Sequence, residues 1–286
     1  MKIVRFLFSF KGLLLMFGIF IGLIMATNLM SFSASEDEIR DAFAKVPYSP
    51  EHHFIPNEKG TLHYITTGDS LKPPVLLIHG SPGSWDNWLD ILTQTDFLNH
   101  YYAIAVDRPG YNQTTLGNGY SLQEQAEFLA PLIKRYCQPC VVVGHSYGGA
   151  LAVQTALDNP EAIKAFVSVA GTVADSLQHP RFYNYILRYT PLQWIMAPEF
   201  MTSNKEMMSL EHDLHALANQ LSAYSGKAAL IQGGEDMLVD PRSARYIQSK
   251  LTQANVRLWT REEMNHFVIW SDKDLVLDAL QWAEAP

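Results

Sequence analysis

Apolar and polar positions along the chain follow two alternating periods. Short continuous apolar runs predict strands that are buried on both faces. These strands cover residues 61–68, 73–80, 101–107, 140–144, 163–171, 227–234 and 255–260. Runs with apolar residues three or four positions apart predict helices over 85–98, 121–136, 149–159, 241–252 and 272–283. Strands alternating with helices at this spacing predict βαβ crossovers, and therefore an α/β fold with a mostly parallel central sheet and helices on both faces.

The alternation is interrupted once, at residues 172–225, which are rich in Met, Tyr, Trp and Leu and predict helices. An insertion at the carboxyl end of a strand lies above the crevice where open α/β sheets bind ligands. We therefore predict a helical lid over 172–225, inserted in a core made of 36–171 and 226–286. Within that core, residues 36–60 predict a polar connector, helical or irregular. The large residues of the lid form either a pocket wall or the lid's own core: Trp194, Met196, Met201, Met207 and Met208.

Residues 1–35 have a different pattern from the rest. Residues 1–11 contain three basic residues, Lys2, Arg5 and Lys11, and no acidic residue, and residues 12–35 carry no charge. This polarity is typical of a signal peptide or signal anchor. The apolar run from Gly12 to about Met30 would reach ~28 Å as a helix, which is close to the thickness of a bilayer core. This length favours an uncleaved membrane helix over cleavage near residues 33–35. Either alternative places the remainder outside the cytoplasm, membrane-anchored or exported as a periplasmic or secreted protein.

Composition narrows the classes of partner. The chain is 48% hydrophobic and 17% charged, as globular proteins are, and its net charge is -8. No basic stripe is available to neutralise phosphates, so nucleic acid is excluded as a partner and a small molecule is expected. The two cysteines, Cys137 and Cys140, form a weak metal or redox pattern because no other Cys or His cluster accompanies them. A local disulfide and two ordinary thiols both remain open, and the sequence does not indicate an oligomeric state.

The stretch "VVVGHSYGGALAV" (141–153) passes from an apolar run through glycines to helix formers. Gly144, Ser146 and Gly148 form the pattern G-x-S-x-G between a predicted strand and a predicted helix. Glycines suit this turn because side chains would collide there, and the turn holds the serine in a strained conformation with its hydroxyl exposed. Ser146 is therefore the candidate nucleophile.

A serine hydroxyl needs a base to accept its proton. His266 follows the last predicted strand, so it returns to the carboxyl edge of the sheet and is the candidate base. His212 and His215 fall in a predicted lid helix, where a solvated helix face is the simpler interpretation.

The imidazole needs a carboxylate that fixes its tautomer. Asp236 follows the strand at 227–234 and is the candidate. Glu235 is adjacent and should point elsewhere, and Asp240 precedes Pro241 as a helix cap. The chain order of serine, aspartate and histidine is the one expected for this architecture.

The oxyanion of the reaction needs N–H donors from two directions. Tyr147, the residue after the nucleophile, supplies one. The turn after the strand at 73–80 supplies the other, and Ser81 is favoured because Pro82 has no N–H. His79 and His145 flank these turns and are interpreted as structural residues.

Five motifs in order resemble those of the α/β-hydrolase family: "HGSPGS" (79–84), "DRPGYNQT" (107–114), "GHSYGG" (144–149), "GGEDMLVDP" (233–241) and "NHF" (265–267). The resemblance covers residues 54–284. It implies a catalytic triad of Ser146, Asp236 and His266, with oxyanion donors at Ser81 and Tyr147. "DRPGYNQT" departs from the usual pattern, in which a glycine and then a serine follow the aromatic residue, and this affects the loop shape. The resemblance also disfavours haloalkane dehalogenases and epoxide hydrolases, which place aspartate at the position of Ser146.

These residues predict a serine hydrolase that cleaves an uncharged or weakly polar carboxylic ester through an acyl-enzyme, as carboxylesterases and lipases do. No cofactor and no metal is required. Carbon–carbon bond hydrolysis, amide cleavage and perhydrolysis remain alternatives on the same triad. A non-catalytic binding protein of the same fold is disfavoured because all three triad residues are present.

Overall fold

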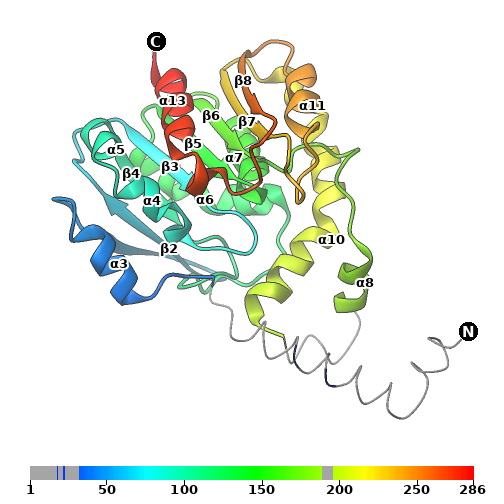
Figure 1. Cartoon of the computed structure of the whole chain (residues 1–286), viewed down its shortest axis with the longest axis horizontal. Helices are drawn as coiled ribbons and strands as arrows, with labels where there is room; N and C mark the ends of the chain where they lie inside the picture. The colour runs from blue at the N-terminus through cyan, green and yellow to red at the C-terminus, as the bar shows by residue number, and fades with distance from the viewer. Residues whose placement is uncertain (1–17, 19–21, 23–31, 189–195) are drawn as a thin grey trace, which may run out of the picture.

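A twisted sheet of eight strands runs through the centre of the molecule in the order β1-β2-β4-β3-β5-β6-β7-β8 (Figure 1). The computed structural model describes residues 18, 22, 32–188 and 196–286. The strands are β1 (Glu51–Asn57), β2 (Gly60–Thr67), β3 (Pro74–Ile78), β4 (Tyr102–Val106), β5 (Cys140–His145), β6 (Ile163–Val169), β7 (Lys227–Gly233) and β8 (Asn255–Arg261).

The sheet is mostly parallel, as predicted. Only the pairings of β1 with β2 and of β2 with β4 are antiparallel among the described strands. All pairings from β4 to β8 are parallel, so the carboxyl ends of these strands meet at one edge. The polar connector predicted over 36–60 is wrong in part, because β1 occupies its second half. The exposed polar side chains and Pro56 of β1 hide a strand that lies at the edge of the sheet.

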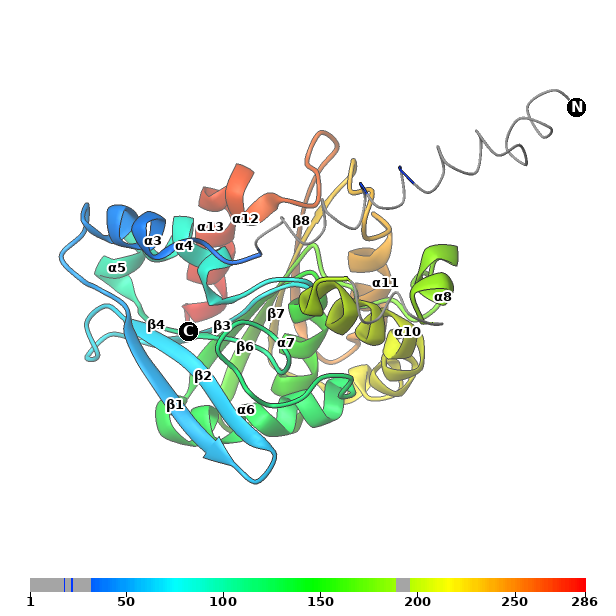
Figure 2. The same ribbon diagram turned by 90° about the horizontal axis from the view of Figure 1, so that it is seen from below.

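Helices cover both faces of the sheet (Figure 2). One face packs against α6 (Leu122–Tyr136), α7 (Tyr147–Asp158) and α11 (Ser243–Lys250). The other face packs against α3 (Glu36–Phe43), η1 (Trp85–Trp88), α4 (Leu89–Leu92), α5 (Thr95–His100), α12 (Val268–Ser271) and α13 (Lys273–Glu284). Alternate residues of β3 enter the two cores, Leu76 and Ile78 one and Val75 and Leu77 the other, because side chains along a strand alternate between faces.

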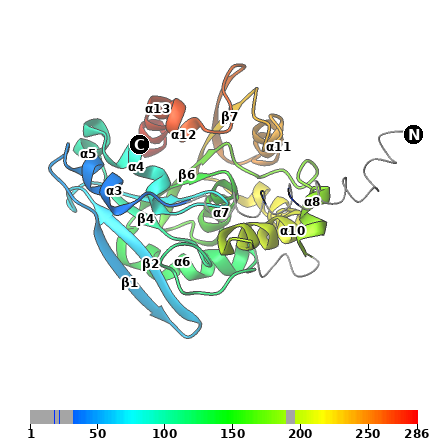
Figure 3. The ribbon, with the colours of Figure 1, turned by 60° about the horizontal axis from the view of Figure 1, so that its bottom comes forward.

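The segment between β6 and β7 holds α8 (Phe182–Arg188), α10 (Pro198–Ala218) and η2 (Leu221–Ala223). We call residues 172–225 the insert. Figure 3 shows α8 and α10 side by side at one end of the molecule. The inner side of α10 is buried through Leu210, Leu214 and Leu217, which join the core around α6 and α7. The insert is therefore packed firmly onto the sheet's helical layer along α10.

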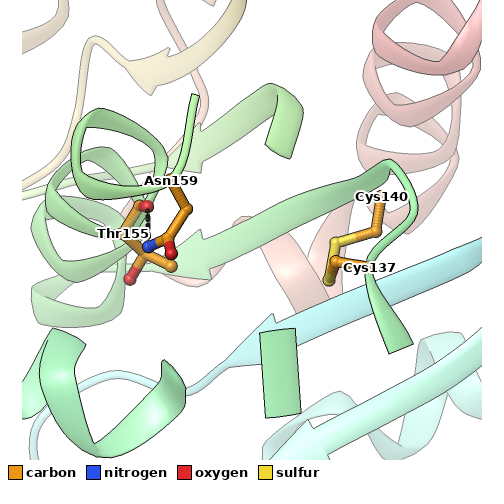
Figure 4. Close-up of a disulfide and its surroundings, with 4 residues drawn as sticks. All are labelled: Cys137, Cys140, Thr155 and Asn159. Carbon is orange, nitrogen blue, oxygen red and sulfur yellow. Dashed lines mark hydrogen bonds between the residues drawn. A yellow bond between two sulfur atoms is a disulfide. The ribbon is translucent and has the colours of Figure 1, made fainter. Parts of the chain in front are cut away.

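A disulfide joins Cys137 and Cys140 (Figure 4). Cys137 ends α6 and Cys140 begins β5, so the bond closes the turn that leads into the strand before Ser146. Of the two possibilities that the sequence left open, the structure contains the disulfide.

The predicted membrane helix falls almost wholly on residues outside the described part. Within the described ranges, no helix is both long enough and apolar enough to cross a bilayer.

Candidate active site

The turn between β5 and α7 places Ser146 at the carboxyl edge of the sheet. Its backbone has φ 55° and ψ -120°, a strained combination for a residue with a side chain. The flanking glycines make the turn possible. A Cβ on Gly144 would lie 1.9 Å from the carbonyl oxygen of Gly148, and one on Gly148 would lie 2.4 Å from that of Ile78. The local sequence therefore fixes the serine at a sharp strand-to-helix turn.

Asp236 and His266 are in contact across the ends of β7 and β8. Nδ1 of His266 lies 2.9 Å from Oδ2 and 3.1 Å from Oδ1 of Asp236. A carboxylate only accepts hydrogen bonds, so Nδ1 carries the proton and Nε2 is left as the basic nitrogen. The backbone N–H groups of Leu238 and Val239 donate to Oδ1 of the same carboxylate, at 2.9 and 2.8 Å.

The charge of Asp236 is stabilised by these donors. Burial by itself would raise the pKa of its carboxyl. The hydrogen bond and charge of His266, together with the two backbone N–H groups, outweigh burial and lower the pKa below its usual value. Asp236 is therefore an anion at every pH near neutrality.

Ser146 and His266 line one pocket of about 720 Å³. Ser81, from the turn predicted to hold the oxyanion, lines this pocket as well. The predicted nucleophile, the predicted base and this turn therefore border the same cavity. Apolar side chains make up much of the remaining wall: Phe32, Pro82, Leu89, Leu238, Phe267 and Trp270. Asp236 lies behind His266, and its side chain is fully buried.

Both predicted oxyanion donors lie near the serine, one next to it in the chain and one in the adjoining turn. Tyr147 is the first residue of α7, so its N–H has no acceptor within the helix. Gly80 abuts the serine, since a Cβ there would lie 3.1 Å from Cβ of Ser146, and Ser81 follows it. Within the described part of the chain, no backbone carbonyl outside the helices and strands accepts the N–H group of Ser81 or of Tyr147. Both groups are available to an oxyanion.

A buried ion pair under this site was not predicted from the sequence. Arg108 and Glu206 of α10 form a salt bridge, with side chains 0% and 1% exposed. Arg108 also donates to the carbonyl oxygens of His79, at 3.0 Å, and Gly80, at 2.7 Å. Glu206 accepts from the hydroxyl of Ser81 at 2.6 Å. The insert is thereby bonded directly to the turn that carries a candidate oxyanion donor.

The ion pair reaches the second donor residue through Gln125. The amide of Gln125 donates to the hydroxyl of Tyr147 at 3.0 Å and to Oε1 of Glu206 at 3.2 Å. Nothing in the sequence distinguishes Glu206 from the charged residues on the solvated side of the same helix. Arg108 belongs to the motif "DRPGYNQT", and this motif is the only sequence feature that pointed to the buried ion pair.

The two histidines that flank the site are buried and neutral. Burial, and then the charge of His266, lowers the pKa of His145 to about 3. Nε2 of His145 lies 3.0 Å from the carbonyl oxygen of His266, to which it donates. Burial, and then the charge of Arg108, holds the pKa of His79 well below its usual value. Nε2 of His79 accepts the N–H of Arg108 at 3.0 Å. Both imidazoles brace the turns around the site.

The alternative histidines and acidic residues that the sequence offered do not line this pocket. The side chains of His212 and His215 are 91% and 73% exposed on α10. Glu235 is exposed, and Asp240 pairs with Arg242. Of the large lid residues, Met207 packs against the core and Met208 lines a separate surface pocket, while Trp194 lies outside the described residues. Among the described residues, no cluster of three acidic, His or Cys side chains is placed to hold a metal ion.

Comparison with known proteins agrees with the fold and the ordered motifs. Residues 75–279 match the model of the Alpha/beta hydrolase family, and the chain belongs to this family. It is 29% identical over 166 residues to human epoxide hydrolase 4, a match that covers 52% of this chain and 43% of that protein. The chain thus matches less than half the length of this curated relative.

Solved structures show the same fold at low sequence identity. The naproxen esterase of Bacillus subtilis aligns with a TM-score of 0.63 and 18% identity, over 87% of this chain and 99% of that one. A bacterial membrane phospholipase A aligns with a TM-score of 0.63 and 18% identity over all of both chains. At these identities the likeness establishes the fold alone.

Proposed function

We propose that this hydrolase is a serine esterase that cleaves carboxylic esters through an acyl-enzyme. The proposal rests on the positions of the candidate nucleophile and the candidate base at one pocket. A serine in a strained strand-to-helix turn faces the same cavity as a histidine whose Nδ1 is fixed by a buried carboxylate. These are the groups that nucleophilic acyl transfer requires.

In the proposed reaction, Oγ of Ser146 attacks the ester carbonyl carbon while Nε2 of His266 takes the hydroxyl proton. The carbonyl π electrons move to oxygen, and the N–H groups of Ser81 and Tyr147 stabilise the resulting oxyanion. The C–O bond to the alcohol then breaks, and His266 returns its proton to the departing alkoxide. Water, deprotonated by His266, attacks the acyl-enzyme, and the acid leaves as Ser146 regains its proton.

An epoxide hydrolase is the second candidate, because human epoxide hydrolase 4 is among the relatives. The chemistry of Ser146 weighs against it. A carboxylate that opens an epoxide forms an ester, which water can hydrolyse. A serine that opened one would form an ether, which a histidine-activated water cannot cleave under these conditions, so the enzyme would stop after one turnover.

Two further features of the sequence extend the proposal to location and domain organisation. We propose that residues 1–35 anchor the protein in a membrane or direct its export, and that the catalytic domain lies outside the cytoplasm. The disulfide between Cys137 and Cys140 supports this location, because disulfides persist in oxidising compartments. Residues 172–225 would act as a lid over the core.

The test is hydrolysis of p-nitrophenyl esters beside hydrolysis of styrene oxide. Wild-type protein should cleave the esters, and Ser146→Ala should lower kcat at least about 10³-fold. Ser249→Ala, at an exposed position on α11, is the matched control and should keep full activity. Turnover of styrene oxide with no ester cleavage would overturn the proposal in favour of the epoxide hydrolase.

A further inference from the structure

A run of exposed apolar side chains extends outward from the wall of the candidate active site. We call Phe182, Met237, Leu238, Phe267 and Trp270 the apolar rim. Their exposed fractions are 78%, 86%, 50%, 52% and 38% respectively. Soluble monomers seldom leave large apolar side chains grouped in this way unless the surface contacts a partner or a membrane.

The rim is continuous with the catalytic pocket. Leu238, Phe267 and Trp270 line both, and the rings of Phe267 and Trp270 lie 5.8 Å apart. Met237 and Leu238 are bonded to the start of α8, since Arg181 donates to the carbonyl oxygen of each, at 3.0 and 3.4 Å. Phe182 follows directly on Arg181. The rim therefore extends from the pocket wall across the loop after β7 to the start of α8.

The N-terminal segment leaves the described structure at the same mouth. Phe32 lines the catalytic pocket, and its ring packs edge-to-face on Phe200 with centroids 4.9 Å apart. The hydroxyl oxygen of Ser84 lies 3.1 Å from the carbonyl oxygen of Phe32, and Asp86 accepts the N–H of Ala34 at 3.1 Å. Residues 12–31, immediately before Phe32, carry no charge. The point where this apolar sequence joins the domain is thus fixed at the pocket entrance.

From these two observations we infer that the apolar rim docks on the lipid bilayer and that the substrate is an uncharged, long-chain acyl ester resident in that bilayer. The inference rests on the proposed esterase function and names its substrate class. A stretch of about 20 apolar residues is long enough to span a bilayer, so an anchor ending at Phe32 would hold the mouth at the membrane surface. Trp and Phe are side chains that favour this interfacial layer.

The charges at the pocket select the head group. Glu38, Asp86 and Asp90 line the cavity, and no Lys or Arg side chain is among the described residues that line it. An anionic head group would meet like charges there, which disfavours its binding. A neutral head group, such as the glycerol of a monoacylglycerol, meets no such repulsion.

The experiment uses the full chain reconstituted in phosphatidylcholine vesicles that contain monooleoylglycerol, with soluble p-nitrophenyl butyrate as the second substrate. The test variant is the double substitution Phe182→Asp and Met237→Asp, because neither side chain lines the catalytic pocket. The double variant should lose about tenfold in rate on monooleoylglycerol, since charged groups resist entry into the lipid interface. Its rate on p-nitrophenyl butyrate should equal that of the wild type.

The matched control is Leu71→Asp. Leu71 is 91% exposed in the loop before β3, at the opposite edge of the sheet from the site. Both of its rates should equal those of the wild type. An unchanged rate of the double variant on monooleoylglycerol would overturn the inference. A double variant that changes the oligomeric state in detergent while keeping that rate would overturn it too, because the rim would then be an interface between copies.

A separate comparison of two substrates tests the preference for a neutral head group. Wild type should cleave monooleoylglycerol faster than anionic oleoyl-lysophosphatidylglycerol in the same vesicles, and the reverse order would refute the neutral head group. Failure of the esterase proposal is recognised separately, as absence of p-nitrophenyl butyrate cleavage by wild type. In that case quenching of Trp270 fluorescence by brominated lipids, isolated by comparison with Trp270→Phe, still tests the docking, and no quenching refutes the docking face.

Discussion

Asp86 is the acidic residue at the pocket whose ionisation depends most on the folded structure. Burial raises the pKa of its carboxyl to about 6, against the hydrogen bonds from Ser84 and Ala34, which lower it. A carboxyl with a raised folded-state pKa holds its proton more tightly in the folded than in the unfolded chain. The folded state is therefore penalised progressively as pH rises from about 4 to above 6, and the penalty is complete above that range.

Asp86→Asn removes this titration. We expect the free energy of unfolding of the variant, relative to wild type, to rise by about 1–3 kcal/mol between pH 4 and pH 8. Urea unfolding at several pH values measures the difference. A difference that is constant across this range would contradict the raised pKa of Asp86.

Asp236 fixes the tautomer of His266 through the contact with its Nδ1. Asp236→Asn keeps the volume of the side chain, but its amide N–H₂ can force the proton of His266 onto Nε2. We expect kcat for p-nitrophenyl butyrate to fall about 10³–10⁴-fold, with an unchanged circular dichroism spectrum. Because the pKa of Asp236 lies below its usual value, wild-type activity should not decline through protonation of Asp236 at any pH near neutrality. A variant retaining a tenth or more of wild-type kcat would argue against this role for Asp236.

Helix α10 contributes a charge to the interior of the site through Glu206. Glu206→Gln leaves the buried guanidinium of Arg108 without a counter-charge, so we expect a loss of about 3 kcal/mol in the free energy of unfolding. The matched control is Glu211→Gln on the same helix. The Glu211 side chain is 50% exposed and pairs with His179, so its loss should cost less than about 0.5 kcal/mol.

The same variant separates positioning from folding. Glu206 bonds to the hydroxyl of Ser81 and, through Gln125, to the hydroxyl of Tyr147, so its loss should loosen both candidate oxyanion donors. At a temperature where the variant is fully folded, we expect kcat to fall about tenfold with little change in KM, because an oxyanion exists only in the transition state. A rise in KM at constant kcat would show that Glu206 shapes the pocket and does not position the donors.

At the scale of the whole molecule, the disulfide secures the turn before β5. Replacing both Cys137 and Cys140 by Ser should lower the free energy of unfolding by about 2 kcal/mol, the value that chain entropy gives for so short a loop. Adding dithiothreitol to wild type should produce the same loss and leave the double variant unaffected. Equal stability of wild type with and without reductant would mean that the bond does not form in solution.

Much of the parallel sheet could be predicted because each buried strand is a continuous apolar run. β1 could not, because Pro56 and its exposed polar side chains follow no strand pattern. The helix predicted over 85–98 is interrupted as η1, α4 and α5, since Thr93 and Gln94 leave the helical path at positions that periodicity does not mark.

Part of the candidate site could likewise be predicted from the sequence, and part could not. Ser146, His266 and Asp236 could be located because each follows a strand end, and topology brings strand ends together. The pairing of Arg108 with Glu206 depends on how α10 packs over the sheet, a contact between positions 98 residues apart that no local pattern encodes.

The acyl-enzyme mechanism is tested most directly by rapid-quench mass spectrometry of wild type mixed with p-nitrophenyl butyrate. A butyryl adduct should form on the peptide that contains Ser146, in a burst with p-nitrophenol release, and should decay at the rate of turnover. Ester turnover with the adduct on another residue, or with no burst and no adduct under conditions where deacylation is slowed, would contradict this mechanism.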